Sequence, residues 1–105
     1  MPLTLRECLP ELAAELESLL RNDNEMELAE QVQSLQIVDR CRCDSRSCAT
    51  IYNVPKPNGA WRGNHRNVVL DTEGLTVLDV LDERIVCIEM LDRDGITETI
   101  HRLLP

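Results

Sequence analysis

Three of the five cysteines lie close together in the sequence, at Cys41, Cys43 and Cys48. In an extended strand the one-residue spacing of the first two places both sulfurs on the same side, because side chains alternate between faces. Residues 44–47 are polar and have the composition of a turn, which would set Cys48 opposite Cys43. We therefore expect residues 37–54 to form a β-hairpin that gathers three thiols.

Three kinds of chemistry are open to such a cluster. Three thiolates and a fourth ligand could make a tetrahedral zinc site, with His65 as the first candidate for the fourth position and Cys87 as the next. A directly opposed Cys43–Cys48 pair could instead form a disulfide, which would close a very short loop and be redox-labile. The third interpretation, which the sequence favours, is that the thiols fill a core that lacks phenylalanine. The expected cofactor is accordingly none, with zinc as the alternative.

The hairpin register also predicts which side chains share a face. Pairing Cys43 with Cys48 gives one face that carries Ile37, Asp39, Cys41, Cys43, Cys48, Thr50, Tyr52 and Val54. The other face then carries Val38, Arg40, Arg42, Ala49, Ile51 and Asn53. Because the two arginines favour water, we expect the first face to point into the core and the second to point into solvent.

Residues 1–36 are predicted to be a helical arm. Leucines recur at spacings of three and four along residues 3–21, which is typical of an amphipathic helix. Thr4 and Glu7 fit a capping box at the start of this helix. Pro10 conflicts with a continuous helix. Either the helix bends there or a shorter helix starts near Pro10, with the proline in its first turn, and we favour a start near Thr4 with a local bend.

A turn at residues 21–24 should lead into a second helix that is capped by Asn24 and runs to about Ser34. Leu28, Val32 and Leu35 would face inward, and the two helices would form an αα-hairpin.

The chain after the hairpin is predicted to be a loop followed by a strand meander. Residues 55–66 are rich in proline and glycine, and the strands are expected at 67–71, 75–81 and 84–91. Residues 95–105 suit a short helix, with a strand as the alternative. The expected fold is one α+β domain over residues 1–105, with an N-terminal αα-hairpin packed on an antiparallel β-meander sheet of about five strands. Residues 1–36 form its helical arm and residues 37–94 its sheet.

The composition argues against several classes of function. A net charge of −8 argues against nucleic acid as a partner, and no stretch approaches the roughly 20 apolar residues that span a bilayer. Acidic residues interrupt the apolar N-terminus, so we expect no signal peptide and a cytoplasmic location. The acids Asp39, Asp71, Asp79, Glu89 and Asp92 are dispersed and are expected on solvated faces and in turns. No local motif indicates catalysis, and we expect no enzyme.

Positive charge is concentrated in one part of the chain. Residues 40–66 hold six basic residues and one acid, although the whole chain is strongly acidic. Trp61, the only tryptophan, lies in this segment beside cations, a combination that can bind a partner's side chains. The alternative, which the sequence favours, is that the basic segment packs against the chain's own acidic helices or is simply solvated. The predicted partner-binding residues are Lys56, Trp61, Arg62, His65 and Arg66. The expected partner is a protein or a second copy of this chain.

The segment RNVVLDTEGLTVLDVLDERIVCIEML and the Cys-x-Cys…Cys hairpin before it resemble small bacterial domains of unknown function. The resemblance implies a bacterial, non-enzymatic domain and carries no specific activity. We therefore expect a small cytosolic protein-interaction domain, for which an immunity or inhibitor role would suit the acidic chain. The alternative is a zinc-stabilised or thiol-redox module built on the cysteine hairpin.

Overall fold

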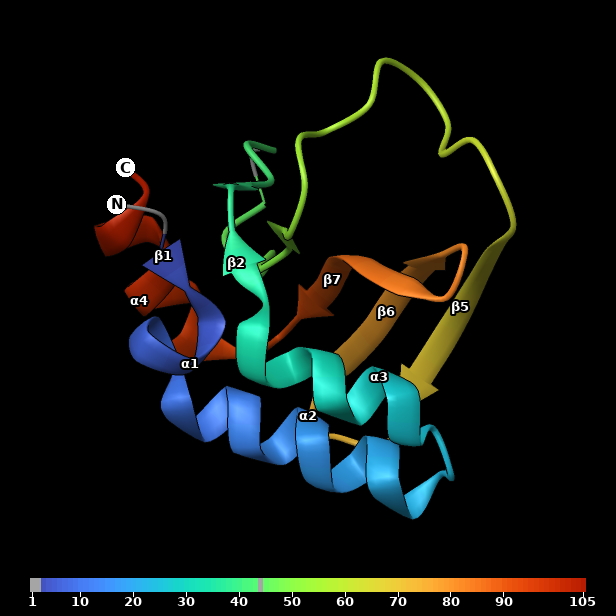
Figure 1. Cartoon of the computed structure of the whole chain (residues 1–105). Helices are drawn as coiled ribbons and strands as arrows, with labels where there is room; N and C mark the ends of the chain where they lie inside the picture. Colours follow the sequence, from blue (N-terminus) through green and yellow to red (C-terminus); the bar gives the residue numbers. More distant parts are fainter. Residues whose placement is uncertain (1–2, 44) are drawn as a thin grey trace.

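The computed structural model describes residues 3–43 and 45–105, which form a layer of helices packed on an antiparallel sheet (Figure 1). The helical elements are α1 (Leu5–Cys8), α2 (Pro10–Asn22), α3 (Met26–Gln31), the 3-10 turn η1 (Val32–Ser34) and α4 (Asp94–Leu103). The main sheet contains β3 (Asp39–Arg40), β4 (Ile51–Tyr52), β5 (His65–Leu70), β6 (Leu75–Leu81) and β7 (Arg84–Leu91). A separate ribbon pairs β1 (Leu3–Thr4) with β2 (Gln36–Ile37). The predicted α+β class is confirmed.

The break between α1 and α2 resolves the conflict at Pro10. The Glu7 N–H donates to Thr4 Oγ1 at 3.2 Å, and that hydroxyl donates to Glu7 Oε1 at 2.7 Å, so α1 is capped as predicted. Leu9 then leaves the helical conformation, and Pro10 enters the first turn of α2, where its missing N–H has no intrahelical partner to lose. The single bent helix was wrong, because two helices separated by one residue occupy this segment.

The predicted αα-hairpin is formed by α2 and α3, which lie side by side beneath the sheet in Figure 1. Leu16, Leu20 and Leu28 are almost completely buried at its centre. The predicted cap at Asn24 was wrong. Asn24 adopts a left-handed conformation (φ 59°) and Glu25 precedes the helix without a capping side-chain hydrogen bond.

The sheet order is β3-β4-β7-β6-β5, so the hairpin strand β4 pairs with the last strand of the meander. One cross-strand row across the sheet consists of Ile51, Ile88, Leu78 and Val68. These four side chains are 0–8% exposed and face the helices. This row is the sheet's contribution to the core.

The hairpin has the predicted register but the opposite orientation. Asp39 pairs with Tyr52, as expected, and the Cys41 N–H donates to the Thr50 carbonyl at 2.9 Å. Of the predicted turn, Asp44 lies outside the described residues, while Arg46 and Ser47 form a turn. The predicted core face was correct for Ile37, which is buried, and for Val38, which is exposed. It was wrong along residues 49–53, where the opposite face supplies the buried side chains Ala49, Ile51 and Asn53.

The prediction assumed that the face carrying the arginines points into solvent. This assumption failed because β3 is a short edge strand. Arg40 lies on the helix side of the hairpin, yet its guanidinium extends past the core and its Nε donates to the Leu104 carbonyl at the end of α4. A long charged side chain can therefore lie on the buried face while its charged end reaches polar groups at the margin.

The meander agrees closely with the prediction. Strands β6 and β7 have the predicted bounds, and β5 begins two residues earlier than expected. Gly74 in the β5–β6 turn adopts φ 71°, and a Cβ there would lie 2.5 Å from the Leu91 carbonyl oxygen. The terminal element is a helix, α4. No helix in the described part of the chain is long and apolar enough to cross a membrane.

The corrected orientation of β4 can be tested by Ile51→Ala. Because Ile51 is fully buried, the truncation should lower the free energy of unfolding by about 2–5 kcal/mol in urea denaturation. The control is Val38→Ala in the same hairpin, where the side chain is 42% exposed and the expected change is within about 0.5 kcal/mol. Equal effects of the two substitutions would contradict the observed orientation.

Candidate metal centre on the open sheet face

The three clustered cysteines meet in space. The sulfur atoms of Cys41, Cys43 and Cys48 all lie within 4.8 Å of one another. A Zn–S bond of about 2.3 Å places the sulfurs of a tetrahedral site about 3.8 Å apart, so small side-chain rotations would suffice to close the set on an ion. Across residues 3–43 and 45–105, this is the one group of three or more potential ligands at such spacing.

Backbone contacts with β7 hold one side of this site. Cys48 forms an isolated bridge with Leu91, and the neighbouring Ala49 N–H donates to the Met90 carbonyl at 2.9 Å. On the other side, the Asp92 N–H donates to the Ser47 carbonyl at 3.0 Å. Cys48 is thus fixed by the strand that runs through the centre of the domain.

The three thiols differ in exposure. Cys48 is buried, Cys41 is half-buried and Cys43 is exposed. Core filling, the interpretation that the sequence favoured, therefore fits Cys48 and fails for Cys43. Cys87 is buried as expected, and Cys8 packs at the margin of the core.

The thiols also differ in acidity. Burial favours a higher pKa for Cys48, but hydrogen bonds from Thr50, Cys43 and Cys41 outweigh it and bring the pKa below its ordinary value. Burial raises the pKa of Cys41. The hydrogen bonds stabilise a thiolate at Cys48, which is the protonation state that binds metal.

Arginines connect the thiol segment to the end of α4. Arg40 donates to the Leu104 carbonyl and, at 3.2 Å, to the Cys41 carbonyl. Arg42 donates to the Pro105 carbonyl at 2.9 Å and to Asp39 Oδ1 at 3.0 Å. The carbonyl of Leu104, the C-cap of α4, lacks an intrahelical donor and carries partial negative charge, so Arg40 satisfies it.

Neither predicted fourth ligand lies with the three sulfurs. His65 is on β5, three strands from β4, a separation of about 14 Å at normal strand spacing. Its Nε2 instead lies 2.8 Å from Asp79 Oδ1. Cys87 is opposite Tyr52 on the neighbouring strand and does not join the cluster.

A polar row crosses the same sheet face, the one directed away from the helices. The register aligns Tyr52, Cys87, Asp79 and Asn67 on four neighbouring strands. Asp79 Oδ1 is within hydrogen-bond distance of His65 Nε2, and the Asn67 Nδ2 donates to it at 2.7 Å. Asp79 was predicted to lie on a solvated face. This was wrong, because only 5% of the residue is exposed.

Asp79 of this row perturbs the acidity of Glu89 and Cys87 on the neighbouring strand β7. A hydrogen bond with Asp79, followed by burial and the negative charge of Asp79, raises the pKa of Glu89 to about 7. Burial and the same aspartate raise the pKa of Cys87. The signal that sequence reasoning missed is the placement of Asp79 between Leu78 and Val80, because an acid inside an apolar strand needs local partners.

The predicted partner-binding residues are divided among different contacts. Arg66 bonds to Glu25 and Glu83, which accounts for part of the positive charge within the protein itself. Lys56 lies 5.8 Å from the centre of the Tyr52 ring. The remaining candidates are His65, which bonds to Asp79, and Trp61 and Arg62, which lie in the segment between β4 and β5. Figure 1 shows this segment as a long arc. A partner surface at this loop stays a prediction.

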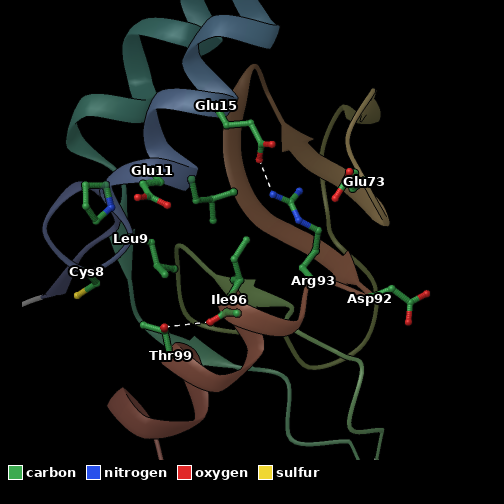
Figure 2. Close-up of a pocket in the computed structure, with 12 residues that line it drawn as sticks. Cys8, Leu9, Glu11, Glu15, Glu73, Asp92, Arg93, Ile96 and Thr99 are labelled. Atoms are coloured by element: carbon green, nitrogen blue, oxygen red, sulfur yellow. Dashed lines mark hydrogen bonds and ion pairs between the residues drawn. The ribbon is translucent and has the colours of Figure 1, made fainter.

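A groove of about 760 Å³ lies between the start of α2 and α4 (Figure 2). Its cation, Arg93, points towards Glu15 and bonds to it and to Thr76 Oγ1. Glu11, Glu73 and Asp92 add negative charge around apolar side chains. This lining indicates a class of ligand less clearly than the three thiols do.

No family model, curated protein or solved structure matches the chain. The resemblance to small bacterial domains therefore stays a prediction, and the function has to be argued from the site itself.

The raised pKa of Glu89 predicts a pH-dependent stability. Glu89 binds its proton more tightly in the folded state than in the unfolded state, so its contribution is complete below the unfolded pKa of about 4.3 and is lost as pH rises to about 7. Relative to wild type, Glu89→Gln should become progressively more stable across this window. Urea denaturation midpoints measured at several pH values check this prediction. The control is Glu98→Gln, at an exposed position on α4. A difference that stays constant with pH would contradict the raised pKa of Glu89.

The loop prediction is tested with the double substitution Trp61→Ala, Arg62→Ala. Both residues lie outside the core, so the melting temperature should stay nearly unchanged while concentration-dependent association, measured by sedimentation, weakens. Arg66→Ala serves as a contrast, because loss of its ion pairs should lower stability by about 0.2–1 kcal/mol. Unfolding of the double variant, or unchanged association of a self-associating wild type, would exclude the loop as an association surface.

Proposed function

We propose that this chain is a small metal-stabilised interaction domain, in which Cys41, Cys43 and Cys48 hold one thiophilic ion of the zinc class. The observation that carries the proposal is the approach of all three sulfurs to within 4.8 Å of one another. Thiolate sulfur is a soft ligand and selects zinc or similar ions over magnesium and calcium.

The sequence and the contacts around the sulfurs support this choice. Three positively charged residues, Arg40, Arg42 and Arg46, flank the cysteines in the sequence and offset the charge of three thiolates. A tetrahedral ion requires a fourth ligand, which a water molecule can supply. Asp44, which lies outside the described residues, stands between two of the cysteines in the sequence, so its carboxylate is included in the test.

In this proposal the ion organises an interaction surface. Binding would hold residues 41–48 in one conformation, and the contacts of Arg40 and Arg42 would transmit that order to the end of α4. The partner would be a protein or a second copy, and an immunity or inhibitor role would suit the net charge of −8. We place the domain in a bacterial cytoplasm, where reducing conditions preserve thiols, and assign it no catalytic step.

Native mass spectrometry after incubation with one equivalent of zinc tests the metal site. Wild type should retain one ion that a chelator removes. Substitution of Cys41, Cys43 or Cys48 by serine removes a metal ligand. It should lower zinc affinity more than loss of a residue that only hydrogen-bonds to a ligand, which costs roughly 10–100-fold. Affinity should also rise with pH, because the thiols must lose protons.

Cys8→Ser is the matched control, because this half-buried cysteine lies on α1, outside the cluster, and its loss should leave zinc binding unchanged. Asp44→Asn shows whether the carboxylate contributes the fourth ligand. Cadmium substitution should add thiolate-to-metal charge-transfer absorption in the ultraviolet. Wild type that remains metal-free at micromolar zinc, or equal loss of binding in Cys8→Ser, would refute the metal site.

A further inference from the structure

The three sulfurs lie close enough to react with one another, but they differ in exposure to solvent. Cys43 is exposed, whereas Cys48 is 7% exposed and is held against β7 by the contacts of its neighbours. A molecule in solution can therefore reach Cys43 first, while Cys48 meets another sulfur only from within the cluster.

The hairpin register also singles out a pair. Asp39 opposes Tyr52, and the hydrogen bond from the Cys41 N–H to the Thr50 carbonyl continues the same alignment. Continuing this alignment by two residues would set Cys43 opposite Cys48, and their sulfurs lie within 4.8 Å of each other. Directly opposed residues of antiparallel strands have Cα atoms about 4.5–5.5 Å apart, within the range of about 4.4–6.8 Å that a disulfide requires.

We propose that a low-molecular-weight disulfide such as oxidised glutathione converts Cys43 and Cys48 into an intramolecular disulfide and thereby releases the bound ion. This inference rests on the proposed metal site and adds its regulation. Cys41 remains a thiol, and one thiol cannot retain an ion that three thiolates held.

The reaction consists of two thiol–disulfide exchanges. The Cys43 thiolate attacks one sulfur of the oxidant, so that a mixed disulfide forms, the oxidant S–S bond breaks and one small thiolate leaves. The Cys48 thiolate then attacks the Cys43 sulfur and displaces the second small thiolate. The two protein sulfurs lose two electrons, and the oxidant becomes two small thiolates. In the zinc-free protein these take up the protons of the cysteines, whereas in the zinc-loaded protein, whose ligands are already deprotonated, they take protons from solvent.

The Cys43–Cys48 bond should be readily reversible, because it closes a loop of only a few residues and removes little chain entropy.

The test treats zinc-free and zinc-loaded protein with a series of glutathione redox ratios. Peptide mapping without reductant should identify a Cys43–Cys48 bond in wild type and in Cys41→Ser. In Cys48→Ser the reaction should stop at a glutathione adduct on Cys43, and in Cys43→Ser neither product should form. From the loaded protein, one equivalent of zinc should appear in a chromogenic chelator at the rate of disulfide formation, and dithiothreitol should restore binding.

Mapping of the wild-type protein does not depend on any variant folding, and circular dichroism checks each variant. Wild type that binds zinc but forms a Cys41–Cys48 bond, a Cys41–Cys43 bond or no bond would overturn the switch and leave the metal site standing. If wild type forms the Cys43–Cys48 bond but never binds zinc, both the metal site and the proposed release of an ion are refuted. Zinc loss without disulfide formation would also refute the proposed mechanism.

Discussion

The pairing of β4 with β7 is the contact on which both the core and the candidate metal centre depend. Ile51 lies opposite Ile88, and the chain just before β4 continues along β7 through the Ala49 N–H and the Met90 carbonyl. These residues are far apart in the sequence, so the pairing is a long-range contact that no local pattern encodes. It places Ile51 over the helices and fixes Cys48 beside Leu91.

From this contact the sheet acquires two different faces. The row of Ile51, Ile88, Leu78 and Val68 meets the leucines of α2 and α3 and excludes water. The next row, Tyr52, Cys87, Asp79 and Asn67, lies on the other face. Partners within that face satisfy its buried aspartate, which offsets the cost of placing a carboxylate in a nearly dry site.

The same two-faced arrangement explains why the thiols can be reactive. Sulfurs in the helix-facing core would be surrounded by leucine and isoleucine, with no donors for a thiolate. On the open face, Cys48 is close to Thr50, whose hydrogen bonds help to lower its pKa, and Cys43 remains exposed. The acidic network around Asp79 and Glu89 lies on β6 and β7 of the same face. The open face therefore carries the thiol cluster and the acidic network, while the opposite face packs on the helices.

Local patterns in the sequence determined the α+β class, the two long meander strands, the capping box at Thr4 and the hairpin register, because each depends on side-chain spacing, turn residues or hydrogen bonds between near neighbours. The tertiary structure decided which hairpin face is buried. That depends on where β7 and the helices lie, and the long side chain of Arg40 can escape a buried face at an edge strand. It also decided that His65 lies with Asp79 and not with the cysteines. Strand order, which no local spacing encodes, separates β5 from the thiol cluster.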